Sequence, residues 1–134
     1  MTIYSGHNPL QTAAYSALTS DSSLMAIIRG VYDEVPESTP APYVTIGEAT
    51  ETDNGTFGRN AWDLSLHLHV WSQAQGFKEC GIIINHLSRI LSQANLTLQD
   101  GSIPFLLLEH VEYLRDPDGI TRHAVARFRA LVEA

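Results

Sequence analysis

The chain has few basic residues and a single cysteine. Eight Lys and Arg stand against fifteen Asp and Glu in 134 residues, a formal net charge of −7. This balance argues against nucleic-acid binding as the main activity, because neutralising phosphates requires clustered cations. Cys80 cannot form an intramolecular disulfide, which favours synthesis in the cytoplasm. No apolar run approaches the roughly 18 residues of a membrane span, and the N-terminus lacks the pattern of a signal peptide. We expect one domain, residues 1–134, without a membrane partner.

Motifs of known chemistry are also missing. The glycines of 55–58 follow no phosphate-binding motif, and no serine has a Gly-x-Ser-x-Gly setting. Cys80 falls on the apolar face of an expected helix, where a free cysteine behaves as a small hydrophobe. Several histidines lie near acids: His67 and His69 with Asp63 on one strand, and His110 and His123 with Glu109 and Glu112 on a later hairpin. Zinc needs three or four such ligands to converge. We expect no catalytic residue, metal or cofactor, with a small metal- or ligand-binding module as the alternative.

The clearest pattern is the alternation of residues 61–71. Trp62 and every second residue after it to Val70 are apolar, while the residues between them are mostly polar. This period of two predicts a strand with one apolar face and places Trp62 in the core. The strand ends at Gly76, where a helical pattern starts and runs to about residue 93. Trp71, on the opposite face at the strand's end, is expected to fix this corner.

Further elements are predicted before this strand. Asn8-Pro9 favours a helix over about 9–19, and Ser20 or Asp21 a short second helix with Gly30 at its left-handed end. Three prolines make 33–42 an exposed connector. A strand is expected over about 43–52. The turn-rich residues 53–60 predict either a hairpin loop or a longer flexible excursion.

A long hairpin is predicted at the C-terminal end. Residues 94–99 suggest a short edge strand, and 103–115 a strand whose two apolar faces suit a central position or cover by a neighbour. Residues 116–119 have the composition of a type I turn, and 120–132 return as the partner strand. The order α-α-β-β-α-β-β predicts an α+β fold. Its sheet should be mainly antiparallel, with about four strands and the helices packed on it.

Charge is unevenly distributed. The acids between Gly30 and Gly58 have no Lys or Arg among them: Asp33, Glu34, Glu37, Glu48, Glu51 and Asp53. The last hairpin carries four arginines: Arg115, Arg122, Arg127 and Arg129. Either the acidic segment is simply solvated, or it complements a partner. The charged fraction of 17% is low for a monomer, which favours a surface partly covered by other subunits.

Three motifs carry a resemblance to a known family. They are V-P…P-Y-V-T-I-G-E within 31–53, L-H-V-W-S…G-F within 64–80, and D-P-D-G…R-H…R-F-R-A within 115–133. In this order and spacing the chain resembles the tail-completion, or tail-terminator, proteins of long-tailed bacteriophages and prophages, which also occur in gene-transfer agents. The resemblance covers nearly the whole chain.

The resemblance implies a structural virion protein without catalytic residues. Such proteins form a ring, usually hexameric, that caps the tail tube and docks on the head-side connector or stopper protein. DNA passes through the axial channel. The expected partners are therefore other copies of the chain, the tail tube protein and the connector, and assembly takes place in the host cytoplasm. An adjacent head–tail joining or neck protein would show the same motifs.

Candidate surfaces follow from charge and exposure. We expect a heterologous ring contact between the acidic segment of one subunit and the arginine hairpin of the next, and we expect the 53–60 loop to become ordered against a tail or neck partner. The interface candidates are Asp33, Glu34, Glu37, Phe57, Arg59, Arg115, Arg122, Arg127 and Arg129. The shortage of cations predicts a neutral or acidic channel that does not bind DNA. Its candidate lining residues are Glu48, Glu51 and Asp53.

Overall fold

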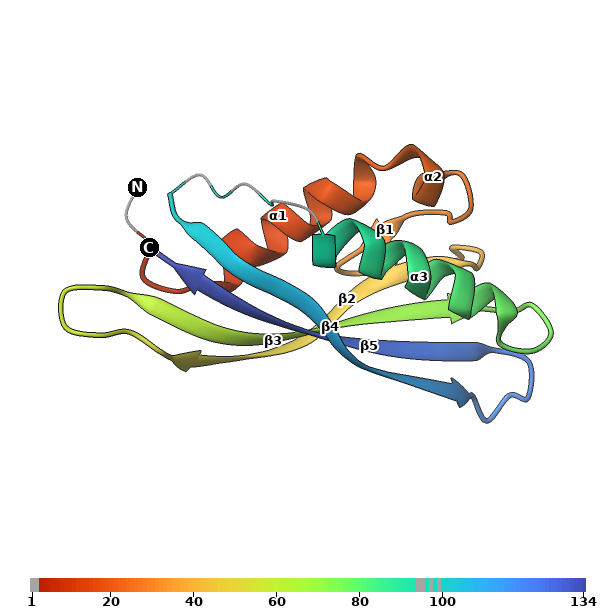
Figure 1. The fold of residues 1–134 in the computed structure, drawn as a ribbon. Helices are drawn as coiled ribbons and strands as arrows, with labels where there is room; N and C mark the ends of the chain where they lie inside the picture. Colours follow the sequence, from red (N-terminus) through yellow and green to blue (C-terminus); the bar gives the residue numbers. More distant parts are fainter. Residues whose placement is uncertain (1–2, 94–95, 97, 99) are drawn as a thin grey trace.

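Helices cover one face of a five-stranded sheet, and the opposite face is open (Figure 1). This arrangement is seen in a computed structural model that describes residues 3–93, 96, 98 and 100–134. The elements in chain order are α1 (His7–Thr19), α2 (Ser22–Met25), β1 (Val31–Tyr32), β2 (Tyr43–Asp53), β3 (Ala61–Ser72), α3 (Lys78–Gln93), β4 (Ser102–Arg115) and β5 (Arg122–Glu133). The predicted α+β class is confirmed.

The strand order in the sheet is β1-β2-β3-β5-β4. The neighbouring pairs are antiparallel except β1 and β2, which run parallel. The sequence prediction missed β1, because two residues are too short to show a period. Of the two alternatives for 103–115, the central position is wrong, and cover by a neighbour stays a prediction. β5 pairs with β3 from Ala61↔Glu133 to Ser72↔Arg122, and this leaves β4 at the edge of the sheet.

The core lies between the helices and the covered face of the sheet. Trp62 is 9% exposed and the alternate residues after it are buried, as the period of two predicts. On β5 the buried positions are equally regular, with Phe128 the largest fully buried side chain. Cys80 is fully buried on α3, as expected, and burial raises the pKa of its thiol to about 11. Buried residues of β3, β5 and α3 therefore make up a large part of the core on the covered face of the sheet.

The helix starts agree only in part with the sequence prediction. The helix predicted over about 9–19 is confirmed as α1, but it begins at His7 with Gly6 as its N-cap, so the expected cap at Asn8 is wrong. Glu51 of β2 accepts hydrogen bonds from the Gly6 N–H and the Ser5 hydroxyl, and a carboxylate at this end of a helix is electrostatically favourable. Asp21 caps α2, accepting from the Leu24 N–H at 2.9 Å, as predicted.

Gly30 does not end α2 in the left-handed conformation, contrary to the prediction. It is buried, and its carbonyl accepts from the Val44 N–H at 3.1 Å as the chain enters β1. Residues 33–42 form the irregular connector that was expected. Of the edge strand suggested at 94–99, residues 94, 95, 97 and 99 lie outside the described residues.

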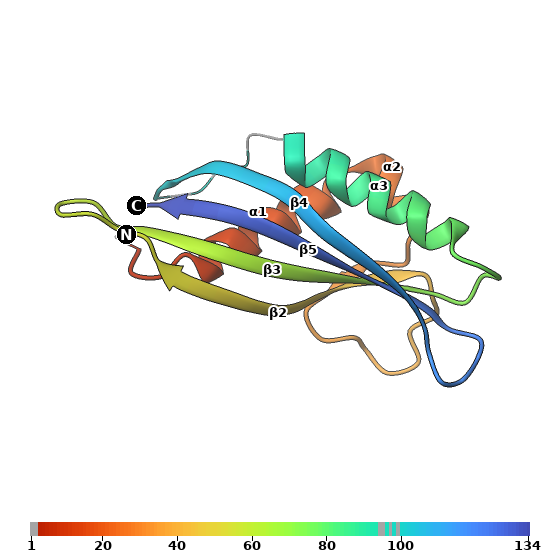
Figure 2. The same cartoon turned by 60° about the horizontal axis from the view of Figure 1, so that its bottom comes forward.

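Two hairpins mark the ends of the molecule. Residues 53–60 form a hairpin loop between β2 and β3, the shorter of the two alternatives, and the loop projects at one end (Figure 1). The 116–119 turn between β4 and β5 projects at the other end (Figure 2). In that turn Gly119 has φ +75° and donates to the Asp116 carbonyl at 3.0 Å, as predicted. Neither hairpin tip is covered by the helices.

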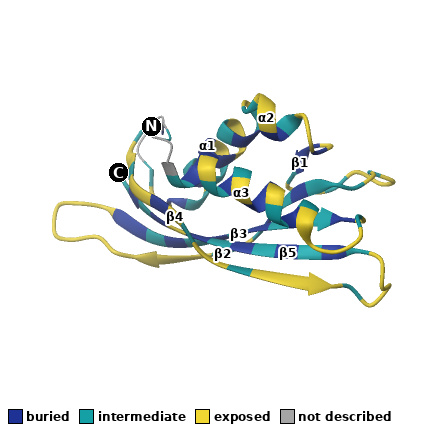
Figure 3. Ribbon diagram, turned by 45° about the vertical axis from the view of Figure 1, so that its right-hand side comes forward, coloured by how far each residue is buried: buried dark blue, intermediate teal, exposed yellow. Residues whose placement is uncertain are grey.

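In the described part of the chain, no helix is both long and apolar enough to cross a membrane. Exposed residues are frequent at the two hairpins and along the second half of β4 (Figure 3).

Candidate assembly surfaces

The open face of the sheet carries ion pairs formed within the subunit. Arg129 donates to both carboxylate oxygens of Asp63, at 2.8 and 3.2 Å, and Arg127 donates to Glu109 at 3.2 Å. The Arg129 hydrogen bonds lower the pKa of Asp63. Both arginines were expected to meet acids of a neighbouring subunit. In the isolated subunit each already has an acidic partner, so they add little net positive charge to this face.

The other two hairpin arginines differ from each other. Arg122 is only 8% exposed, and its guanidinium donates to the Ile120 carbonyl at 2.9 Å and lies 5.8 Å from the Phe77 ring centroid. This burial disagrees with its expected place on an interface, because Arg122 is in phase with the buried residues Ala124 and Ala126 on the covered face of β5. Arg115, at the end of β4, is exposed. Arg115 is therefore the better interface candidate of the two.

Apolar side chains remain exposed along β4. Phe105 is 36% exposed, Leu107 44% and Leu114 38%. Register places Leu107 opposite Arg129 and Leu114 opposite His123, so both lie on the open face. A long edge strand with exposed apolar side chains is a ready site for association. Among the described residues, this exposed apolar surface of β4 is a candidate for contact with a partner.

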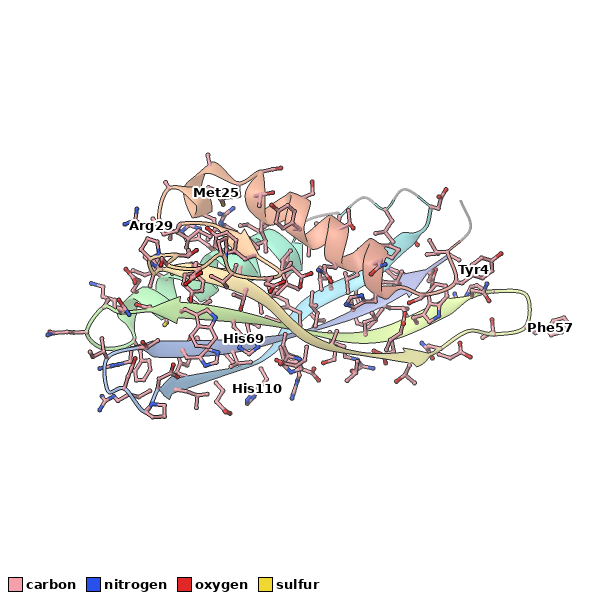
Figure 4. All side chains as sticks on the ribbon, turned by 180° about the vertical axis from the view of Figure 1, so that it is seen from behind. Tyr4, Met25, Arg29, Phe57, His69 and His110 are labelled. Carbon is pink, nitrogen blue, oxygen red and sulfur yellow. The ribbon has the colours of Figure 1, made fainter. Side chains whose placement is uncertain are left out.

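A polar cluster on the open face joins β2, β3 and β5. His69 Nδ1 and His123 Nε2 are 2.6 Å apart, and His69 Nε2 is 2.7 Å from a carboxylate oxygen of Glu48. Trp71 stacks on the His123 ring with centroids 3.8 Å apart. Figure 4 shows His69 among the side chains of this face. The hydrogen bond from His69 lowers the pKa of Glu48, while burial first, and then the neighbouring His69, lower the pKa of His123.

The sequence prediction placed His69 and His123 on separate elements and missed their contact. The alternation of β3 and β5 put both on the polar face, but their proximity depends on which strands pair. The imidazole nitrogens are hydrogen-bonded to each other and to Glu48 instead of converging on one point. Within the described residues, no three His, Cys, Asp or Glu side chains are placed to hold a metal ion.

Trp71 was expected to fix the corner between β3 and α3, but it does not. Its indole donates to Thr45 at 3.1 Å on the open face. The corner is instead joined by Ser72, whose hydroxyl donates to Glu79 at 2.6 Å and accepts from the Ala74 N–H at 3.1 Å. Trp71 thus packs strand to strand, and a buried serine links strand to helix.

The three acids proposed for the channel do not share a face. Glu48 bonds to His69 on the open face, whereas Glu51 bonds to Gly6 at the start of α1 on the covered face. The irregular register between Ile46 and Ala49 accounts for the change of side along β2. Asp53 accepts from the Gly55 N–H at 2.9 Å at the base of the hairpin loop. The three acids therefore cannot form one lining surface.

An exposed aromatic and an apolar pocket complete the candidate surfaces. Phe57 at the tip of the 53–60 loop is 108% exposed. A pocket of about 330 Å³ lies between the end of α2 and the start of α3, with Ile27, Ile82 and Ile83 among its lining residues. In this part of the molecule Ile27 is 39% and Ile82 45% exposed.

Comparison with known proteins gives one consistent picture. The sequence model of the family described as "Tail completion protein gp17" matches residues 12–133. The tail completion protein gp17 of Bacillus phage SPP1 is 26% identical over 123 residues, which span 90% of this chain and 89% of that protein.

Two solved structures are similar along nearly the whole chain. A chain from the virion of a native gene transfer agent particle has a TM-score of 0.89 and 28% identity, covering 98% of this chain and 100% of its own length. The structure of the bacteriophage SPP1 gp17 protein has a TM-score of 0.63 and 25% identity, covering 92% of this chain and 88% of its own. The sequence motifs, the fold and these matches agree, and the chain belongs to the tail completion protein gp17 family.

Proposed function

We propose that this chain is a ring-forming tail terminator of a tailed phage, prophage or gene transfer agent. The ring, which we take to have six subunits, caps the tail tube at the head-proximal end of the tail and joins it to the head-side connector protein. Its role is structural and not catalytic. The observation that supports this most strongly is the similarity over 98% of the chain to a component of a gene transfer agent virion.

The exposed surfaces of the subunit support assembly. A ring requires two different surfaces on each subunit that meet head to tail. The exposed apolar side chains of β4 and the two projecting hairpins are candidates for these two contact surfaces. Exposed ion pairs contribute only about 0–1 kcal/mol each, so apolar contacts must supply most of the affinity. The exposed acids Asp33, Glu34 and Glu37 then set orientation against a neighbour's cations.

The DNA channel is proposed to be neutral or acidic. Arg127 and Arg129 are paired with acids of the same sheet. Because their charges are already paired, they are poor candidates for a channel surface that binds DNA. Glu48 on the open face, and Asp53 at the loop, remain channel candidates. Glu51 is better explained by its contact with the start of α1. We expect no binding of duplex DNA at physiological salt, and sub-micromolar binding would instead indicate a DNA-gripping neck component.

The first test is the mass of the purified protein by size-exclusion chromatography with light scattering. A ring of six 14.8 kDa chains has a mass of about 89 kDa. If the protein stays monomeric at all concentrations, both alone and with purified tail tubes, the ring proposal is wrong. Binding of a metal or small ligand by a stable monomer would favour the alternative of a ligand-binding module.

The second test separates a terminator from a neighbouring neck protein. Removing the gene of a terminator should give tails of irregular length that do not join heads, because nothing caps the growing tube. Removing a neck protein should leave tails of normal length that fail to join heads. Electron microscopy of lysates measures both features, and wild-type complementation is the control. Normal tail lengths would contradict the terminator role.

A further inference from the structure

Two histidines contact each other directly on the open face of the sheet. His69 Nδ1 and His123 Nε2 are 2.6 Å apart, and the two rings stack with centroids 4.8 Å apart. Their side chains are only 15% and 14% exposed. An acid lies at each end of the pair: Glu48 is 2.7 Å from His69 Nε2, and Asp116 is 3.9 Å from His123 Nδ1. These four side chains, which we call the histidine cluster, form one line from β2 to the 116–119 turn.

The positions of the protons in the cluster follow from what each atom can do. An ionised carboxylate only accepts hydrogen bonds, so His69 Nε2 carries its hydrogen and donates to Glu48. The Nδ1 of a neutral His69 is then bare, and it accepts from the Nε2–H of His123. The Nδ1 of a neutral His123 is bare as well, and it faces Asp116. The intact cluster therefore has one free place for a proton, at His123 Nδ1.

A first and a second proton have different consequences for the cluster. The first binds at His123 Nδ1, where the imidazolium faces the carboxylate of Asp116, and no contact is broken. The second has to bind at His69 Nδ1, which already accepts the hydrogen bond from His123. Two N–H groups of two like-charged rings would then face each other at 2.6 Å. The rings must separate before the second proton can bind.

The backbone of β2 makes room for this arrangement. The register of β2 on β3 is irregular between Ile46 and Ala49, and this stretch carries Glu48 to the His69 ring. A Cβ on Gly47 would lie only 2.5 Å from atoms of the same ring. Gly47 therefore leaves the space that the His69 ring occupies.

Other titratable groups around the pair lie on β3 and β4. His67 Nδ1 is 3.0 Å from the backbone carbonyl of Glu48. β4 places the uncharged Leu114 opposite His123, and Glu112 is the next charged residue of β4 on that face. The helices cover the other face of the sheet (Figure 1). Among the described residues, the hydrogen bonds and ion pairs of the two rings all lie within the cluster.

We propose that the histidine cluster is a proton-sensitive latch, which binds one proton intact and opens when a second proton separates His69 from His123. Trp71 of β3 stacks on the His123 ring of β5, and its indole donates to Thr45 of β2. Opening therefore disturbs a contact that joins three strands. The latch lies within a single subunit, so it goes beyond the proposed ring and does not depend on it.

An NMR titration of the intact protein tests the latch, with ¹³C in the histidine rings and ¹⁵N in the tryptophan indoles. As the pH falls, His69 and His123 should take up their protons in two separate steps. The indole signal of Trp71 should shift most in the second step, whereas that of Trp62, which is buried on the covered face, should stay unchanged. One common step, or a Trp71 signal that does not respond to the second step, overturns the inference.

Removing one ring of the pair tests whether the contact causes the two steps. In His123→Asn the remaining His69 should titrate in one step, and the late shift of Trp71 should be lost. The matched control is His110→Asn, at an exposed position of β4 (Figure 4), which should keep both steps. A late Trp71 shift that persists in His123→Asn contradicts the latch.

Crowding the His69 ring from the backbone provides a second, independent variant. Gly47→Ala should displace the ring, because the new Cβ meets it at 2.5 Å, and the two separate steps should be lost. Gly81→Ala on α3 is the matched control, since its added Cβ meets nothing within 4 Å, and it should titrate like the wild type. Two unchanged steps in folded Gly47→Ala overturn the inference. If this variant does not fold, His123→Asn decides alone.

Discussion

Two lysines on the open face of β4 should block assembly without unfolding the subunit. The perturbation is Leu107→Lys with Leu114→Lys, at positions that are 44% and 38% exposed. Fully burying a leucine contributes about 1.5–3 kcal/mol. The exposed shares of the two side chains therefore leave about 1–2.5 kcal/mol available to a subunit contact.

Losing this contribution should weaken association by about 5- to 60-fold. Burying two ammonium groups adds a further cost. Folding should change less, because the methylene stem of lysine can still cover the apolar surface that leucine covered, with its charge in water. Lysine is also a residue with which natural sheets protect an exposed edge.

The assay is light scattering over a dilution series, with urea unfolding to measure the free energy of unfolding of each variant. Tyr15→Lys, at a 46% exposed site on α1, is the matched control and should assemble like the wild type. If the double variant folds and forms rings with unchanged affinity, β4 does not contribute apolar contact to assembly and the argument from its exposure is refuted.

Three further predictions concern charge and reactivity. The pKa of His123 is lowered from 6.5 and that of Glu48 from 4.5, so the unfolded chain binds more protons than the folded one as each group titrates. The contribution of His123 is therefore present above pH 6.5 and is lost as the pH falls below that value, and the contribution of Glu48 is present above pH 4.5 and is lost below it. Urea unfolding at a series of pH values should show this loss, and His123→Asn should flatten the slope below pH 6.5; an equal slope in the variant would contradict it. Cys80, with its thiol pKa raised to about 11, should react with a thiol reagent far more slowly in the folded than in the urea-unfolded protein at mildly alkaline pH, and equal rates would show that the site opens readily. Reversing Arg127 and Arg129 to Glu should weaken assembly in low salt while costing about 0–2 kcal/mol of folding stability through two half-exposed ion pairs; unchanged ring formation in low salt would show that these charges do not orient the contact.

Local patterns in the sequence determined most of the elements. The alternation from Trp62 to Val70 predicted β3 and its buried face, and the spacing of apolar residues after Gly76 predicted α3 with Cys80 inside. The composition of 116–119 predicted the turn at Gly119. These features depend on residues close together in the chain, so periodicity and turn chemistry are sufficient to find them. The family motifs likewise depend on local residue identity, and the family they indicated is confirmed.

Only the tertiary structure decided how these elements pair. The position of β4 at the edge and the contact between His69 and His123 both follow from the pairing of β5 with β3 and β4. The bond from Gly6 to Glu51 joins residues 45 apart. Local periodicity states which face of a strand a residue occupies, but not which strand lies beside it. That choice is made by packing and register over the whole sheet, and it determines which side chains remain exposed for assembly.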